Sequence, residues 1–367
     1  MNSHIALMFV TSGHSGVDRI VTNLLPEFGN TKHSFDLLTI PGHGPYSNNL
    51  PDNIKLRRLP ALNQSTVFPG LIWYLYHHRP HILLTASHKL NRAALLARII
   101  TGVSTRIAIR MGMSVTAKIE EMKSTKSQAL QDSMRKWYPQ ADAVITPSQG
   151  VGNDLIEIAG INSKNLHVIP NPLINDMFYS MADKPVNHPW LKDSEVPIIL
   201  SVGSLEARKD FSTLIRAFSK VKEKKQCRLL VLGEGKQRNK LLELAEELGV
   251  GNHVDLPGYD ENPYRYMKNA SVFVLSSRRE GASAVIVEAL ACGTPVVSTD
   301  CPSGPAETLQ NGRYGKLVPI GDHESMAEAI STTIANPQPK NLLREAVEKN
   351  RTDLSAKQYL RAMGITS

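Results

Sequence analysis

The sequence is poor in cysteine and has no long apolar run, and both shortages narrow the classes of protein it could encode. Its 367 residues include only three cysteines, and these have neither the CxxC spacing of metal or redox motifs nor the density of a disulfide framework. No apolar run reaches the roughly 18 residues that span a bilayer. The N-terminus lacks the basic region and the long apolar stretch of a signal peptide, and it is expected to form a strand. These absences predict a cytoplasmic protein with reduced cysteines and no membrane span.

The charge balance is basic, with 42 Lys+Arg against 34 Asp+Glu and a net charge of +8. Such an excess favours an anionic partner, although solubility alone would also explain it. Basic residues gather at 55–58, 77–81 and 220–228, but no cluster alternates with aromatics as a nucleic-acid groove would. Phosphorylated ligands or an anionic membrane surface therefore suit the charge better than nucleic acid.

Short, apolar, β-branched runs alternate with amphipathic stretches along most of the chain. This alternation predicts parallel sheets covered by helices on both faces. The length suits two such domains, so the expected class is α/β with two Rossmann-like doubly wound domains. The expected strands lie within residues 4–10, 35–40, 81–87, 105–111, 142–148 and 166–170, and within 197–205, 228–235, 253–259, 271–277, 294–300 and 315–319.

A proline-containing polar stretch interrupts this rhythm and marks the expected domain boundary. We predict an N-terminal acceptor-binding domain over 1–175, a linker over 176–192 and a C-terminal nucleotide-sugar domain over 193–345. The remaining segment, 346–367, is expected to form a helix that could pack back on the N-terminal domain. Ligands of such sheets bind at the carboxyl ends of the strands, so two facing domains would enclose a cleft.

The segment 276–307 carries the clearest chemical signal. Glu280 follows an expected strand, and a glycine turn then leads into a helix over 284–292 with Ser283 as its N-cap. The unpaired amides and positive dipole of a helix N-terminus can receive a phosphate. Residues of this turn and of the first helical turn that we expect at the donor are Gly281, Ala282, Ser283, Ala284 and Val285.

Glu288 lies one turn into the same helix, where its side chain leans back toward the N-terminus. A carboxylate there would repel a phosphate but could accept hydrogen bonds from vicinal hydroxyls such as those of ribose. Glu280 could do the same for a sugar. Taken alone, the pair fits an exposed loop glutamate and an ordinary helix glutamate better than a ligand site.

The whole segment resembles family 4 of the retaining glycosyltransferases. Members carry a glutamate, seven residues, a second glutamate and an ALACGTPVV-like run, matched here by Glu280, Glu288 and residues 289–297. The resemblance implies the GT-B fold, in which two Rossmann-like domains face each other across a cleft. It also implies that Glu288 binds the ribose of a nucleotide-sugar and that Glu280 contacts the donor sugar.

Residues 200–218 resemble the first strand and helix of that family's donor domain, where a basic pair grips the diphosphate. Lys209 matches the usual lysine, whereas Ser204 stands where an arginine is common, and Arg208 could supply the missing charge. The GEGK run at 233–236 lacks the full Walker spacing and is interpreted as a strand-to-helix turn.

Other resemblances are weaker. Gly258 and Tyr259 correspond to the loop that holds the nucleotide base, or they serve only as turn and packing residues. Gly16, with Gly13 as a second choice, matches a glycine turn near the donor phosphates. A histidine that many members place after the strand at 105–111 is replaced by Arg110, Met111 and Gly112. His14 and His88 could take its role or could be ordinary structural histidines.

The resemblance implies transfer of a hexose or N-acetylhexosamine, with retention, to a saccharide or lipid-linked hydroxyl in bacterial polysaccharide or lipopolysaccharide biosynthesis. A UDP-sugar is the expected donor, with peripheral contact at the inner face of the cytoplasmic membrane. No metal or other cofactor is expected. A nucleotide-sugar 2-epimerase or a non-catalytic sugar-nucleotide-binding protein are the alternatives, whereas a dinucleotide oxidoreductase would need a GxGxxG motif that is missing.

Overall fold

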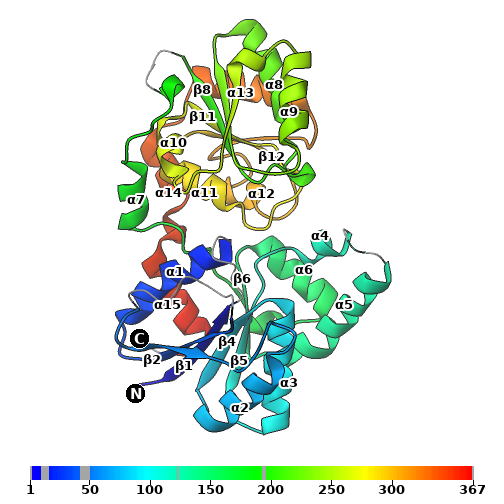
Figure 1. The fold of residues 1–367 in the computed structure, drawn as a ribbon, viewed down its shortest axis with the longest axis vertical. Helices are drawn as coiled ribbons and strands as arrows, with labels where there is room; N and C mark the ends of the chain where they lie inside the picture. Colours follow the sequence, from blue (N-terminus) through cyan, green and yellow to red (C-terminus); the bar gives the residue numbers. More distant parts are fainter. Residues whose placement is uncertain are drawn as a thin grey trace. The chain divides into compact units, whose positions relative to one another are not determined.

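The computed structural model describes residues 2–9, 16–41, 50–120, 122, 124–191 and 196–365. The chain divides into two compact units, the first formed by Met1–Leu173 with Asn350–Ser367 and the second by Ile174–Lys349. Each unit is built on one parallel sheet with helices packed against it (Figure 1). The predicted α/β class with two doubly wound sheets is therefore confirmed.

The first unit has seven parallel strands in the order β3-β2-β1-β4-β5-β6-β7. Its strands are β1 His4–Phe9, β2 Ser34–Thr39, β3 Ile54–Arg58, β4 Ile82–Ala86, β5 Arg106–Arg110, β6 Ala143–Thr146 and β7 Leu166–Val168. Its helices are α1 Gly16–Gly29, α2 Phe68–His78, α3 His88–Thr101, α4 Val115–Glu120, α5 Ser124–Trp137, α6 Gln149–Ala159 and α15 Thr352–Ala362. Six of these strands coincide with predicted runs, whereas β3 was not predicted from the sequence.

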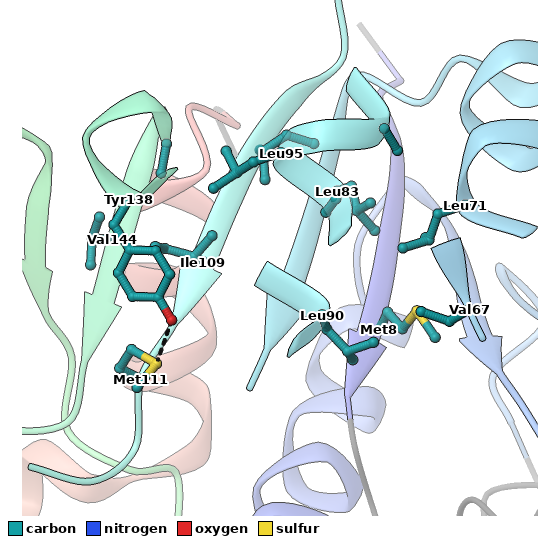
Figure 2. Packing of buried hydrophobic residues seen from close by; sticks show 14 of the residues in the cluster. Met8, Val67, Leu71, Leu83, Leu90, Leu95, Ile109, Met111, Tyr138 and Val144 are labelled. Carbon is teal, nitrogen blue, oxygen red and sulfur yellow. Dashed lines mark hydrogen bonds between the residues drawn. The ribbon is translucent and has the colours of Figure 1, made fainter. Parts of the chain in front are cut away.

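The first sheet has a hydrophobic core on each face. On one face, Leu71 of α2 and Leu90 of α3 pack toward Met8 and Leu83 of the sheet (Figure 2). On the other face, the aromatic rings of α1 and α15 belong to a second buried cluster. Apolar strands buried on both sides are what a parallel sheet requires, which explains the apolar runs of the sequence.

The C-terminal segment belongs to the first unit, where α15 packs beside α1 (Figure 1). Thr352 donates a hydrogen bond to the Glu27 carboxylate (2.8 Å), and Ser355 donates to the Pro170 carbonyl (2.9 Å). The chain leaves the first unit after Leu173 and returns to it at Asn350. There the Leu173 amide donates a hydrogen bond to the Asn350 carbonyl (2.9 Å). Both connections between the units therefore leave the first unit at one point.

The second unit has six parallel strands in the order β10-β9-β8-β11-β12-β13. Its strands are β8 Ile198–Val202, β9 Arg228–Leu232, β10 Val254–Gly258, β11 Val272–Leu275, β12 Val296–Thr299 and β13 Lys316–Val318. Its helices are α7 Asp176–Ala182, α8 Phe211–Lys224, α9 Arg238–Glu247, α10 Tyr264–Asn269, α11 Ala284–Ala291, α12 Pro305–Thr308, α13 His323–Ala335 and α14 Lys340–Glu345. All six strands lie within the predicted runs.

The structure differs from the prediction in residues 176–192, which we expected to form a linker. This segment belongs to the second unit, and its first half is helix α7. Phe178 of α7 packs on Tyr264 of α10, with ring centroids 4.4 Å apart, and Asn262 donates a hydrogen bond to the Met181 carbonyl (2.7 Å). None of the prolines that suggested a linker lies inside this helix, so they do not prevent it from packing.

Asp36 on β2 is the centre of a buried polar cluster in the first unit. Its Oδ2 receives hydrogen bonds from Tyr74 (2.7 Å) and His4 (2.9 Å) and forms an ion pair with the Arg57 Nε (2.7 Å). Burial raises the pKa of this carboxyl, but the interactions with the three partners outweigh it and hold the pKa well below its usual range. The ionised carboxylate therefore stabilises the folded state.

This cluster makes the stability of the protein depend on acid pH. Because the pKa of Asp36 is lower in the folded chain, its contribution is complete above the unfolded value of about 3.9 and is lost as the pH falls further. We expect Asp36→Asn to lower the free energy of unfolding by about 3 kcal/mol at pH 7. Urea unfolding at pH 7 and pH 3 should show a smaller pH effect in the variant.

Asp353→Asn is the matched control, because its exposed pairing with Arg351 (3.0 Å) should contribute only about 0.5 kcal/mol. Equal pH effects in the wild type and in Asp36→Asn would contradict the assignment of the acid sensitivity to Asp36.

Candidate functional site

Lys209 and Glu280 form an ion pair at the carboxyl edge of the second sheet. Lys209 ends a short 3-10 helix, Ala207–Lys209, after β8, and Glu280 follows β11, which is the neighbour of β8 in the sheet. The Lys209 Nζ lies 2.6 Å from the Glu280 Oε1, and each side chain is only 10% exposed. Two strand-end loops that are 71 residues apart in sequence therefore meet in one charged contact.

Two serine hydroxyl groups that directly follow β11 hold this pair in place. Ser277 donates a hydrogen bond to the Glu280 Oε1 (2.6 Å), and Ser276 donates to the Lys209 carbonyl (2.8 Å). Both bonds to the Glu280 carboxylate therefore reach Oε1, and Oε2 receives none from the residues that the structure describes. One carboxylate oxygen is held by the protein and the other remains able to accept a hydrogen bond.

Helix α11 begins beside Glu280, as the sequence predicts. The amides of Ala284 and Val285 have no backbone acceptor in the described part of the chain. Ser283 precedes them as N-cap, but its side chain makes no capping bond, in contrast to our expectation. Its backbone is left-handed (φ 41°), and its buried hydroxyl finds no partner among the described residues. The first turn of α11 therefore keeps free donors for an anion.

Glu288 lies in the second turn of α11 and is 1% exposed. It has polar interactions of its own, so it is no solvated surface glutamate. The turn before α11 is more exposed than Glu288, since Gly281 and Ala282 are half-buried. The structure thus pairs Glu280 with Lys209 and places Glu280 four residues before α11, whereas the role of these residues toward a donor stays a prediction.

Arg208 is placed differently from Lys209. Its exposed guanidinium pairs with Glu206 (Nε to Oε2, 3.0 Å) and contacts the Ser204 hydroxyl (3.4 Å). It makes no contact with Glu280 among the described interactions. Arg208 and Ser204 are therefore near the pair in sequence but belong to the outer side of the loop.

The GEGK run forms the turn from β9 to α9, as predicted, and it supports the β8 loop. Gly233 has φ 142°, and a side chain there would place its Cβ 1.9 Å from the Gly203 carbonyl oxygen. Gly235 has φ 159° and lies close to the Leu205 backbone, with a Cβ that would be 2.5 Å from the Leu205 carbonyl oxygen. The glycines let this turn pack directly on the backbone that leads to Lys209.

Gly233→Ala should therefore destabilise the second unit strongly. The added methyl group would push the β8 loop away, and we expect the free energy of unfolding to fall by about 3 kcal/mol. Gly249→Ala is the matched control, since Gly249 also has a positive φ (68°) but no atom within 4 Å of the added Cβ. Its loss should be about 1 kcal/mol. Equal losses in urea unfolding would show that the close contact has no effect.

The predicted base-binding residues lie at the end of β10, which β9 and β8 separate from β11 in the sheet. Gly258 ends β10, is buried with φ 100°, and accepts a hydrogen bond from the Gly233 amide (2.8 Å). The Tyr259 side chain is 65% exposed. Gly258 thus serves the turn, while Tyr259 has a ring that is free to pack on a ligand.

The candidates of the first unit are spread along its sheet. Gly16 is the exposed first residue of α1, whereas Gly13 and His14 lie outside the described residues. His88 opens α3 after β4, and its Nδ1 lies 3.1 Å from the Tyr138 hydroxyl. That hydroxyl also bonds to Met111 Sδ (3.3 Å; Figure 2). His88 is therefore tied into the core, as an ordinary structural histidine would be.

The described residues include neither a candidate metal-binding group nor a candidate membrane-spanning helix. They contain no group of three or more His, Cys, Asp or Glu side chains that could hold a metal ion. Within the same part of the chain, the helices are all too short or too polar to cross a membrane.

Comparison with known proteins places this fold and site in one class. A family model described as glycosyl transferases group 1 matches residues 186–353, and one described as glycosyl transferase 4-like domain matches residues 15–172. The lipopolysaccharide outer core galactosyltransferase WaaB superposes with a TM-score of 0.77 at 18% identity, covering 98% of this chain and 99% of its own. The GT-B fold is therefore shown.

Sequence relatives agree over nearly the whole length. An N-acetylgalactosamine-N,N'-diacetylbacillosaminyl-diphospho-undecaprenol 4-alpha-N-acetylgalactosaminyltransferase of Campylobacter jejuni is 29% identical, over 97% of this chain and 95% of its own. Anabaena HepE, solved with UDP, has a TM-score of 0.79 at 17% identity, over 99% of this chain and 100% of its own. The chain belongs to the group 1 glycosyltransferases with a glycosyltransferase 4-like domain.

Proposed function

We propose that this glycosyltransferase moves a hexose or N-acetylhexosamine, with retention of configuration, from a nucleotide diphosphate sugar to an acceptor hydroxyl. The observation that carries the proposal is the Lys209–Glu280 pair beside the free amides of α11. A cation, a helix N-terminus and an acceptor oxygen within neighbouring loops match the phosphate and hydroxyl groups of such a donor.

Departure of the nucleotide diphosphate is the step that needs most help, because negative charge accumulates on the leaving group. Lys209 has three N–H donors and uses one toward Glu280, which leaves donors for a phosphate oxygen. The amides of Ala284 and Val285 would add a fixed dipole at the same place. In this proposal Arg208 assists from the rim of the loop.

The two glutamates have different tasks in this proposal. Glu280 is anchored through Oε1, so Oε2 would accept a hydrogen bond from a hydroxyl of the transferred sugar. Glu288 would accept hydrogen bonds from the ribose hydroxyls, with Gly281, Ala282 and Ser283 lining the donor and Tyr259 beside the base. Gly16 would contribute a backbone amide to the phosphates. Neither glutamate acts as a general base.

UDP is the nucleotide that we propose for the donor. HepE, of the same fold, has been solved with UDP and with UDP-glucose. The Campylobacter relative is named for a diphospho-undecaprenol-linked substrate, and another relative, LpsE of Rhizobium meliloti, for lipopolysaccharide core biosynthesis. We infer a saccharide or lipid-linked acceptor in bacterial surface glycan synthesis. Lys209 and the α11 amides supply the positive charge, so transfer should proceed without a metal.

A donor screen tests this proposal. Purified protein is incubated with UDP-, GDP- and ADP-sugars, and release of the nucleotide is measured with and without EDTA. We expect release from a UDP-sugar at an unchanged rate in EDTA. The configuration of the new linkage, measured by NMR on the product, should match that of the donor. Failure of all three donor classes, or inversion of configuration, would contradict the proposal.

The uneven charge of the two units supports peripheral membrane contact through the first unit. That unit holds 20 Lys+Arg against 11 Asp+Glu, a net charge of +9, whereas the second unit holds 22 against 23. Trp73 and Tyr76 of α2 are also 49% and 55% exposed in the first unit. Aromatic side chains of this kind favour the bilayer interface, and the basic surplus favours anionic lipids.

Vesicle binding tests this contact. We expect the protein to sediment with phosphatidylglycerol vesicles and to be released by about 0.5 M salt, since screening weakens surface attraction. Trp73→Ser should weaken the binding. Equal sedimentation with vesicles of phosphatidylcholine, a zwitterion with no net charge, would contradict a charge-driven contact.

A further inference from the structure

Arg110 is a buried cation with neutral partners only. It is the last residue of β5 and is 3% exposed. Its Nε donates a hydrogen bond to the Tyr359 hydroxyl (2.8 Å), and its Nη2 donates to the Asn171 side-chain oxygen (2.7 Å). No carboxylate pairs with it among the described residues.

Two other buried charges, those of Asp36 and Lys209, are neutralised within the fold. Asp36 is surrounded by Arg57, His4 and Tyr74, and Lys209 is paired with Glu280. An arginine cannot escape burial by losing its proton, and a desolvated cation without a counter-charge is unfavourable. The two hydrogen bonds of Arg110 could be made by a neutral side chain, so they do not by themselves explain a guanidinium here.

The third nitrogen of this guanidinium is kept uncovered by a glycine. Nη1 has no hydrogen-bond partner in the described part of the chain. A side chain at Gly112 would place its Cβ 2.8 Å from Nη1. Arg110 also stands at the carboxyl end of its strand, the edge at which doubly wound sheets bind their ligands. A donor with a fixed orientation thus faces the ligand edge of the first sheet.

We propose that Arg110 binds a phosphoryl group of a substrate through Nη1, with Tyr359 and Asn171 holding the guanidinium in position. This rests on the proposed function, which supplies two phosphorylated substrates: the nucleotide-sugar and a phosphate-linked acceptor. The negative charge of the substrate would supply the counter-charge that the described residues do not give Arg110. Arg110 is therefore an anion-binding residue, and its burial is unfavourable until the substrate binds.

The test separates binding from folding. In the Lys209→Ala background, which removes the proposed donor cation, inorganic pyrophosphate is titrated by calorimetry with and without Arg110→Gln. We expect Arg110→Gln to weaken pyrophosphate binding at least tenfold, on the scale of a lost charge-assisted pair. In the otherwise native chain it should leave the melting temperature unchanged or raise it, because it removes an unpaired buried charge.

Tyr359→Phe is the matched control. It removes one neutral hydrogen bond but keeps the cation, so pyrophosphate affinity should stay within about twofold to threefold. Gly112→Ala is a second variant, which keeps Arg110 but covers Nη1, and it should weaken binding as Arg110→Gln does. Unchanged pyrophosphate affinity in both Arg110→Gln and Gly112→Ala would overturn the proposal, as would a lowered melting temperature with unchanged affinity.

Two further arms identify the substrate. If Arg110→Gln weakens UDP binding, the phosphoryl group is the nucleotide's; if it raises only the KM for the acceptor, the group is the acceptor's. The proposed donor site fails separately, if Lys209→Ala leaves UDP binding unchanged. Weakened UDP binding or a raised KM for the acceptor in Arg110→Gln would each support the proposal. If neither value changes, the proposal is overturned.

Discussion

Lys209→Ala is expected to lower kcat/KM for the nucleotide-sugar by about 10³-fold, the loss typical of a donor that stabilises developing charge. Lys209 is the one cation that the described structure places directly on Glu280, and its remaining N–H donors are available to the diphosphate of the proposed donor. UDP binding should weaken together with turnover, since the same contact serves the free nucleotide. Steady-state nucleotide release and calorimetry with UDP would measure the two effects.

The same substitution should also lower stability. Removing Lys209 leaves the Glu280 carboxylate, 10% exposed, with Ser277 alone, and we expect the free energy of unfolding to fall by about 3 kcal/mol. Arg208→Ala is the matched control, because its exposed pairing with Glu206 should contribute less than about 1 kcal/mol. Near-normal turnover in folded Lys209→Ala would remove Lys209 from the donor site.

Glu280→Gln is expected to lower turnover by about 100-fold while leaving UDP affinity within about threefold. The amide oxygen can still accept from Ser277 and Lys209, so the loop should keep its place. Only the negative charge is lost, which in the proposed site faces the transferred sugar. Nucleotide release from the UDP-sugar, compared with calorimetry of UDP alone, separates these two effects.

Glu206→Gln is the control for this variant, because Glu206 lies in the neighbouring loop but is exposed and pairs with Arg208. Its turnover should be unchanged. If Glu280→Gln instead loses UDP affinity in proportion to turnover, Glu280 acts on the nucleotide, and the division of tasks between Glu280 and Glu288 is wrong.

The fold could be predicted from the sequence wherever strands are apolar. β11, with the run Val272–Leu275, is buried throughout and is visible as an apolar segment. β3 was missed because its sequence, IKLRR, has three basic residues, which suit an edge strand. Helix α7 was missed because the prolines behind it suggested a linker, although Phe178 packs against α10. Tertiary contacts decided both cases.

The site could be predicted only in part. The helix after Glu280 is a local feature, so the sequence shows it together with the free amides of Ala284 and Val285. The 2.6 Å contact between Lys209 and Glu280 joins two loops that only the pairing of β8 with β11 brings together, so spacing along the chain cannot reveal it. The role of each residue toward the donor remains a prediction.

Arg110 shows a different limit of sequence reasoning. The resemblance predicts a histidine near its position, but its burial and its contacts with Tyr359 and Asn171 depend on how α15 and the segment after β7 pack in the first unit. A residue 249 positions away determines its surroundings. Only the packed structure shows that the charge is unpaired among the described residues.

Calorimetric titration of the full chain with UDP, in the presence of EDTA, tests the donor site most directly. We predict binding at one site, unaffected by EDTA and weakened at least tenfold in Lys209→Ala and in Glu288→Gln, as expected for lost charged hydrogen bonds. Absence of binding, or equal binding by the wild type and both variants, would contradict the account.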